Sequence, residues 1–225
     1  MIKIEKVKTY GWEQAFRGMR NPKNSWDSSD SDFDFPSCQG CPHQDKDCNY
    51  IEHCIVLGKE DLRLGNLLAN AGPDHGKFLR MITVYMDITA PLYWWKEYDT
   101  YKVGTVANSC STMHRIHAKE FTPDDFSHEH LFNGFGEGMY KDQLRATIDC
   151  LNQARTLFLK TKDKKYWWQM IQLLPTSYNQ LRTVSLNYAV LRNMYARKNH
   201  KLDCWRTFCE FIESLPYSEL ITGGE

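Results

Sequence analysis

The sequence predicts an α+β fold, and two patterns carry that prediction. The first has the period of two that is typical of a β-strand. It is formed by Ile82, Val84, Met86 and Ile88, alternating with Thr83, Tyr85 and Asp87. The second has the three-to-four spacing of amphipathic helices and fills the second half of the chain. A length of 225 residues suits one domain, residues 1–225, with a small insertion.

The first third of the chain should alternate short elements with turns. Ile2 and Ile4 alternate with charged residues, which indicates a short edge strand. Residues 12–19 can form one or two helical turns, and residues 21–32 are rich in turn formers and read as a loop. Leucines at helical spacing predict a helix over residues 60–70. Gly72 follows this helix and is available for a left-handed cap.

After the strand at residues 82–88, Pro91 indicates the start of a helix, because proline is tolerated in a first helical turn. We expect that helix to run through residues 92–98, and the small, polar, non-periodic residues 103–111 to form a loop. Three sets of apolar residues further on predict helix faces. They are Leu144, Ile148, Leu151 and Phe158; Leu181, Val184, Tyr188, Leu191 and Tyr195; and Trp205, Phe208, Cys209 and Ile212.

Composition limits the kinds of partner. The 28 Lys and Arg residues equal the 28 Asp and Glu residues, so a broad electrostatic grip on a nucleic acid polymer is disfavoured and any anion site must be local. No apolar run reaches the roughly 20 residues of a membrane span, and no secretion signal is visible, so we expect a cytoplasmic protein. Seven Trp and twelve Tyr indicate either a large aromatic core or stacking faces for a ring ligand.

Four cysteines lie close together in residues 38–54, and they are Cys38, Cys41, Cys48 and Cys54. In a reducing compartment, such a set indicates metal binding or free thiols before disulfides. The first pair has the spacing of a zinc knuckle, whereas the later spacings match no standard finger. A structural zinc ion is therefore one interpretation, and free thiols are the other.

Residues 91–114 place an aromatic helix just before a polar loop. Hydroxyls, an amide, a thiol and the imidazole of His114 lie within a few residues of one another in that loop. Such a set can hold a phosphate or a base edge. The alternative is a helix C-terminus whose side chains bond to the local backbone.

The order of these parts resembles the flavin-dependent thymidylate synthase family, also called thymidylate synthase complementing proteins. A leucine-rich helix ends at Gly72 and is followed by His75, and a strand and an aromatic helix lead to a polar loop with Asn108 and Ser111 three residues apart. Leu174-Pro175 and a later segment with Asn187, Arg192 and Arg197 resemble the family's Leu-Pro and its C-terminal helix. The resemblance covers about residues 60–212 and implies a central antiparallel sheet flanked by long helices, with residues 38–54 as an insertion.

The catalytic signature of the family is largely rewritten. Thr100, Tyr101 and Lys102 stand where the family has Arg-His-Arg, and Ser111 lies one residue later than the family spacing. Ser109 replaces the acidic residue of an Asn-Glu pair, and Ile171 stands where an arginine precedes the Leu-Pro. Arginine and lysine are not equivalent for forked phosphate contacts. Inheritance of the fold is therefore better supported than inheritance of the chemistry.

The resemblance implies FAD as hydride carrier, a reduced nicotinamide (NADP) to recharge it, a folate one-carbon donor, a pyrimidine deoxynucleotide substrate and a homotetramer. It assigns cofactor binding to His75, Tyr101, Lys102, Asn108 and Asn187. It assigns substrate binding to Lys102, Thr105, Ser109, Ser111, Arg192 and Arg197, with Lys102 as the main charge for a phosphate. No catalytic residue is assigned. Because Arg192 and Arg197 are five apart on a helix, at most one should face a given pocket.

Three hypotheses follow. The first is an FAD-dependent enzyme that methylates a pyrimidine deoxynucleotide, dUMP or a related one. The second is a nucleotide-binding or structural relative of that fold that has lost flavin chemistry, and the rewritten triplet favours it. The third is a zinc-organised interaction protein on an unrelated helical fold, which accounts for the cysteines but leaves the order of the other parts unexplained.

Overall fold

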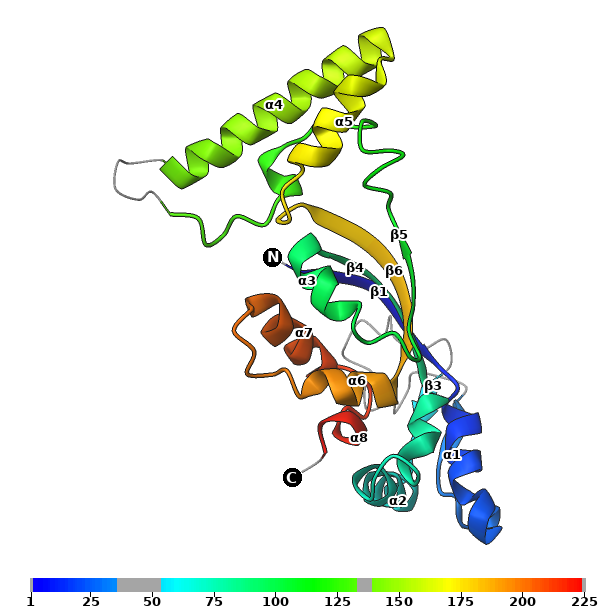
Figure 1. The fold of residues 1–225 in the computed structure, drawn as a ribbon. Helices are drawn as coiled ribbons and strands as arrows, with labels where there is room; N and C mark the ends of the chain where they lie inside the picture. Colours follow the sequence, from blue (N-terminus) through cyan, green and yellow to red (C-terminus); the bar gives the residue numbers. More distant parts are fainter. Residues whose placement is uncertain (1, 36–53, 133–138, 224–225) are drawn as a thin grey trace. The chain divides into compact units, whose positions relative to one another are not determined.

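The computed structural model describes residues 2–35, 54–132 and 139–223 (Figure 1). These residues divide into two compact units. Unit 1 comprises Met1–Lys3, Thr89–Thr100 and Asn108–Arg182, and unit 2 comprises Ile4–Ile88, Tyr101–Ala107 and Thr183–Glu225. No helix among the described residues is long and apolar enough to cross a membrane.

A four-stranded sheet has the order β1–β4–β6–β5, and its strands are β1 (Lys3–Tyr10), β4 (Thr83–Pro91), β6 (Asn179–Asn187) and β5 (Val106–Ser109). Hydrogen bonds from Tyr188 N to Ile82 O and from Leu92 N to Tyr178 O set β4 and β6 antiparallel. The α+β class and the antiparallel sheet predicted from the sequence are confirmed. The strand predicted at residues 82–88 is β4, and its inward residues are buried as expected.

Two predicted elements are wrong. The segment after Leu174-Pro175 is not one long helix, because residues 179–187 form β6 and only Tyr188–Tyr195 form a helix, α6. Gln180, Val184 and Leu186 alternate with more exposed neighbours, so the strand buries one face against the core. The loop predicted at residues 103–111 contains the short strand β5, in which every residue is exposed.

Unit 1 contains α3 (Leu92–Tyr98), the short turn η4 (Pro123–Asp125), α4 (Met139–Thr161) and α5 (Lys164–Leu173). The helices α4 and α5 lie side by side (Figure 1). As predicted, Ile148 and Leu151 are buried on one face of α4, where Leu144 and Phe158 pack beside them. The aromatic face of α3 is also buried and is fixed by a hydrogen bond from Trp95 Nε1 to Gln180 O at 3.0 Å.

Unit 2 holds the other helices and the short strands β2 (Asp32–Phe35) and β3 (Cys54–Val56), which pair antiparallel. The helices are α1 (Trp12–Arg20), α2 (Lys59–Asn70), α6, α7 (Asp203–Glu213) and α8 (Glu219–Thr222), with the turns η1 (Asn21–Lys23), η2 (Trp26–Ser28) and η3 (Gly76–Arg80). The predicted helices at residues 12–19, 60–70 and 205–212 are confirmed. Gly72 has the predicted left-handed conformation, with φ of +110°.

A buried ion pair joins α1 to α2. The Arg20 guanidinium lies 2.6 Å from the Asp61 carboxylate, which is fully buried and also accepts hydrogen bonds from the Ser29 and Ser31 hydroxyls. The aromatic surplus also serves the core, because Trp12, Trp94, Trp95 and Trp205 are all less than 2% exposed. Most of the tryptophans therefore belong to the hydrophobic core, which was the first of the two interpretations of the aromatic content.

Candidate functional site

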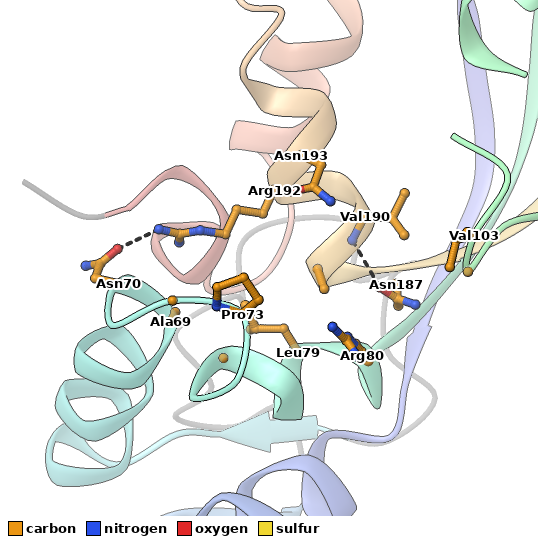
Figure 2. Close-up of a pocket in the computed structure, with 14 residues that line it drawn as sticks. Ala69, Asn70, Pro73, Leu79, Arg80, Val103, Asn187, Val190, Arg192 and Asn193 are labelled. Atoms are coloured by element: carbon orange, nitrogen blue, oxygen red, sulfur yellow. Dashed lines mark hydrogen bonds between the residues drawn. The ribbon is translucent and has the colours of Figure 1, made fainter. Parts of the chain in front are cut away.

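A cavity of about 460 Å³ lies wholly within unit 2 (Figure 2). The C-terminal end of α2, the turn η3, the loop before β5 and the first turns of α6 form its walls. Its lining residues are Ala69, Asn70, Gly72, Pro73, Gly76, Leu79, Arg80, Val103, Gly104, Asn187, Ala189, Val190, Arg192 and Asn193. The volume is within the range of about 300–1,000 Å³ that is typical of small-molecule sites.

The lining of this pocket is positively charged. It contains Arg80 and Arg192 and three asparagines, but no aspartate or glutamate. In a chain whose formal net charge is zero, two arginines without a lining carboxylate are a local concentration of positive charge. A cavity of one sign raises the local concentration of oppositely charged ligands. The pocket therefore favours an anion.

The two arginines differ in how they are held. Arg192 reaches across the pocket to Asn70, whose Oδ1 lies 2.7 Å from its Nη2, and its Nη1 donates to Leu220 O at 3.0 Å (Figure 2). Arg80 is exposed and has no hydrogen bond or ion pair with any residue that the structure describes. Arg192 is thus a fixed part of the wall, whereas Arg80 is a cation available to a ligand.

The N-terminus of α6 faces the same pocket. Asn187 is the N-cap of α6, and its Oδ1 accepts a hydrogen bond from Val190 N at 3.0 Å (Figure 2). Tyr188 N already donates to Ile82 O and Val190 N to Asn187 Oδ1, so the Ala189 N–H and the helix dipole are what the start of α6 offers to an anion. This local positive potential adds to the charge of Arg80 and Arg192. In Figure 2, Arg80 lies beneath Asn187 in the view, so the free arginine and the helix start both border the cavity.

Gly104 brings a backbone segment close to α6. Its φ is +80°, a conformation that favours glycine. A Cβ built at this position would lie 3.0 Å from Asn187 Nδ2 and 3.1 Å from a Val190 methyl carbon. Glycine is therefore favoured twice here, once by the backbone conformation and once by the close approach to the Asn187 and Val190 side chains.

The loop that carries Gly104 is anchored outside the pocket. Tyr101 OH accepts a hydrogen bond from Arg197 Nε at 2.8 Å, and the Arg197 guanidinium lies 5.0 Å from the centre of the Trp205 ring. The Thr105 hydroxyl donates to Tyr101 O at 2.5 Å. Arg197 and Tyr101 thus hold the loop in place and do not line the cavity.

The structure brings together two of the residues that the sequence assigned to ligand binding, Asn187 and Arg192. As expected, only one of the two arginines, Arg192, borders the pocket, although Arg197 lies in the turn after α6 and not on the helix. Lys102 is exposed and precedes Val103, but it is not among the lining residues. His75 lines a different cavity, between α1, α2 and η3. The binding roles of Lys102 and His75 stay predictions.

Asn108, Ser109 and Ser111 belong to unit 1. Asn108 and Ser109 are exposed in β5, and Ser111 Oγ accepts hydrogen bonds from the backbone N–H groups of Met113 and His114, at 3.2 and 2.8 Å. The local-bonding interpretation of the polar loop therefore describes Thr105 and Ser111. Ligand roles for Asn108, Ser109 and Ser111 stay predictions.

Sequence reasoning missed Arg80, Asn70 and Asn193. Arg80 ends a 3₁₀ turn between a helix and a strand, where no periodic pattern or motif marks it. Asn70 is the last residue of a predicted helix, and Asn193 follows Arg192 on the exposed side of α6. The sequence does contain one signal for the start of α6. An asparagine before an apolar periodic segment, such as Asn187, is typical of a helix N-cap.

The cysteine cluster cannot be placed. Cys38, Cys41 and Cys48 lie outside the described residues, and so does the side chain of Cys54. Within residues 2–35, 54–132 and 139–223, no group of three or more His, Cys, Asp or Glu side chains is arranged to hold a metal ion. A structural zinc ion at the four cysteines stays a prediction, and elemental analysis showing about one zinc per chain would support it.

Comparison with known proteins gives the class of the fold. The structure superimposes on thymidylate synthase X (ThyX) from Helicobacter pylori with FAD and dUMP, with a TM-score of 0.66 and 15% identity, covering 99% of this chain and 98% of that chain. A second H. pylori ThyX structure, also complexed with FAD and dUMP, gives a TM-score of 0.64 at 16% identity, covering 97% of this chain and 98% of that one.

A UMP/dUMP methylase, PolB from Streptomyces cacaoi bound with 5-Br UMP, gives a TM-score of 0.60 at 12% identity, covering 100% of this chain and 92% of that chain. The chain therefore has the fold of flavin-dependent thymidylate synthases. At sequence level, no family profile and no curated protein matches it. The likeness to these proteins thus concerns the fold alone.

Proposed function

We propose that this chain is an FAD-dependent enzyme that methylates a pyrimidine deoxynucleotide, dUMP or a related one, with methylenetetrahydrofolate as the one-carbon donor. The observation that carries the proposal is the pocket in unit 2, where Arg80, Arg192 and the start of α6 face one cavity whose lining holds no carboxylate. It occurs on a fold whose solved examples include ThyX structures with FAD and dUMP.

The residues of the pocket fit the anionic part of such ligands. Both FAD and dUMP carry phosphate groups, and phosphates prefer arginine forks and helix N-termini. Arg80 would supply the charge-assisted hydrogen bonds, and the side-chain NH₂ groups of Asn187 and Asn193 would supply neutral donors. Gly104, whose missing side chain leaves the wall open beside Asn187, would let the ligand approach the backbone.

In this proposal, the protein residues position the ligands and stabilise their charges, and none of them acts as a nucleophile. FAD, when bound, supplies hydride transfer, and a reduced nicotinamide such as NADPH would recharge it. Arg192 keeps its geometry through its bonds to Asn70 and Leu220, so the pocket is shaped before any ligand enters. Such preorganisation lowers the cost of fixing the nucleotide.

A second candidate function is a nucleotide-binding relative without flavin chemistry. It is favoured by the contacts of Thr100, Tyr101 and Lys102, the three residues that stand in place of the family's Arg-His-Arg. Thr100 Oγ1 donates to Glu97 O at 2.7 Å, and Tyr101 OH accepts from Arg197, so both side chains have structural bonds. Lys102 alone of the three has no bond to any described residue.

A homotetramer remains part of the proposal. Val103 is 90% exposed and Val106 is 66% exposed, and both lie in the segment that includes one wall of the pocket. Burial of these two side chains against a second copy would be consistent with such an assembly. Sedimentation at micromolar concentration should show a species about four times the 26.4 kDa chain mass, whereas a monomer alone would contradict this part.

The test of function uses the full chain purified without added cofactor. Its visible absorbance should show flavin bands, or acquire them after incubation with FAD and removal of the excess. With NADPH, methylenetetrahydrofolate and dUMP, mass spectrometry should then detect the methylated nucleotide. Nucleotide binding without flavin retention or product would support the inactive relative. Failure to bind both FAD and every pyrimidine monophosphate would refute both functions.

A further inference from the structure

A second cavity in unit 2 takes no part in the phosphate site of the proposed function, although His75, to which the family resemblance assigns a cofactor contact, is among its lining residues. The turn η3 contributes to both cavities, with Leu79 and Arg80 lining the first and Lys77 and Phe78 lining the second. The second cavity has a volume of about 910 Å³ and lies between α1, α2 and η3. We refer to this cavity as the α1–α2 groove, and its lining residues are Gln14, Arg17, Gly18, Met19, Arg20, Asn21, Pro22, Lys23, Ser25, Leu64, Leu67, Leu68, Asp74, His75, Lys77, Phe78 and Met81.

The groove has an apolar surface that the fold does not bury. Its lining includes Leu67, which is 60% exposed, and Met81, which is 46% exposed. Phe78 and Met19 also line it, although most of their surface is buried in the core. A cavity that gathers exposed apolar side chains is typical of a binding site. The methionine sulfurs favour contact with an aromatic ring in particular.

The rim of the groove is cationic. Arg17, Lys23 and Lys77 border it, against a single acidic residue, Asp74. Arg20 also lines the groove, but its charge is already matched by the buried Asp61. Lys23 and Lys77 are exposed and form no ion pair with any residue in the described ranges. The apolar wall is therefore next to uncompensated positive charge.

We propose that the α1–α2 groove binds a small molecule with an aromatic, apolar body and one anionic group, such as a carboxylate or a sulfonate. The body would lie against Leu67, Phe78 and Met81, and the anion would face Lys77. The inference does not depend on the proposed function, because the two cavities share no lining residue. A ligand that had only one of the two features would leave either the apolar wall or the cationic rim unmatched.

The probe for this site is 1-anilinonaphthalene-8-sulfonate, which has an aromatic body and one negative charge, and its fluorescence rises in an apolar site. We expect saturable binding of one probe per chain. The uncharged N-phenyl-1-naphthylamine has the same ring body and should bind about tenfold more weakly, because a charge-assisted contact is lost. An excess of dUMP should not displace the sulfonate.

Two charge-changing variants test the location, each with a matched control. Lys77→Glu should weaken sulfonate binding about tenfold or more, whereas Lys141→Glu, at an exposed position on α4, should not. Leu67→Glu should abolish binding, whereas Leu173→Glu, at a position 48% exposed on α5, should leave it unchanged. Melting temperatures of all four variants show that they fold.

Three outcomes would overturn the inference. Non-saturable binding would mean adsorption to the surface at large. Equal effects of each variant and its control would place the probe outside the groove. Displacement by dUMP would mean that the probe occupies the nucleotide pocket. A failure of this kind is distinguishable from failure of the proposed function, since the latter concerns flavin spectra and dUMP binding alone.

Discussion

Replacing Arg80 with methionine separates ligand binding from folding in the pocket of unit 2. Arg80 lines the cavity, is exposed, and has no bond to the described residues. A hydrogen bond to a charged group contributes about 1.5–3 kcal/mol, and an exposed site takes the lower part of that range. We therefore expect Arg80→Met to weaken dUMP binding by about tenfold. Substitutions at such exposed positions change folding stability by less than about 0.5 kcal/mol, so the melting temperature should hardly move.

Arg192→Met provides the contrast. The variant removes hydrogen bonds to Asn70 Oδ1 at 2.7 Å and to Leu220 O at 3.0 Å, which leaves their acceptors unpaired. Losing such partners costs about 1–3 kcal/mol, and for a chain of this size each kcal/mol lowers the melting temperature by about 2–4 °C. Arg192→Met should therefore reduce both stability and dUMP affinity, whereas Arg80→Met should reduce affinity alone.

Isothermal titration of each variant with dUMP, with and without FAD, measures these effects. Lys102→Met is the control, because Lys102 is an exposed cation near the pocket that does not line it. We expect its effect on affinity to be less than about threefold, and the affinity of the wild type to fall with added salt more steeply than that of Arg80→Met. If Lys102→Met weakens binding more than Arg80→Met does, the assignment of the main charge to Arg80 is wrong.

Three further predictions concern the wall and the scaffold. Gly104→Ala should lower the melting temperature by at least about 2–4 °C and weaken dUMP binding, because φ of +80° is strained for alanine and the new Cβ would contact Asn187. An unchanged melting temperature and an unchanged dUMP affinity would contradict the tight packing of Gly104 against α6. Asp61→Ala leaves the buried Arg20 unpaired and should destabilise the fold by about 3–5 kcal/mol in urea unfolding, whereas a loss under about 1 kcal/mol would contradict the buried pair. The hydrogen bond from the Glu60 backbone N–H lowers the pKa of Asp30, so the Asp30 carboxylate should stabilise the fold above about pH 4 and lose that effect as the pH falls through its lowered pKa. Asp30→Asn should remove this pH-dependent contribution to the free energy of unfolding. An unchanged pH profile of stability in the variant would refute the prediction.

The sequence predicted β4 and α3 well because each has a signal contained within a few residues. The alternation at residues 82–88 fixes one buried face, and Pro91 marks the point where the strand gives way to the helix. The same local reasoning failed at β6. Leu181, Val184, Tyr188 and Leu191 fit helical spacing by coincidence across the junction at Asn187, where the strand ends and α6 begins. The pairing with β4 decides the conformation there, and a helical pattern in sequence cannot show it.

The pocket was predicted only in part for a similar reason. Asn187 and Arg192 were found through the order of motifs, but Arg80 depends on η3 folding back towards α6, a contact across about a hundred residues of sequence. Gly104 lies in the predicted polar loop, but only the structure shows that its backbone comes close to Asn187 and Val190. The polar residues of the predicted loop were less informative, because Thr105 and Ser111 bond to their own neighbours.

A crystal structure of the chain grown with FAD and dUMP would test directly whether the unit 2 pocket binds a nucleotide phosphate. We predict an ordered phosphate in the unit 2 pocket, with oxygens within about 2.7–3.2 Å of the Arg80 guanidinium and of the Ala189 backbone N–H in the first turn of α6. A nucleotide phosphate ordered in the α1–α2 groove or on unit 1, with the Arg80 pocket free of phosphate, would contradict it.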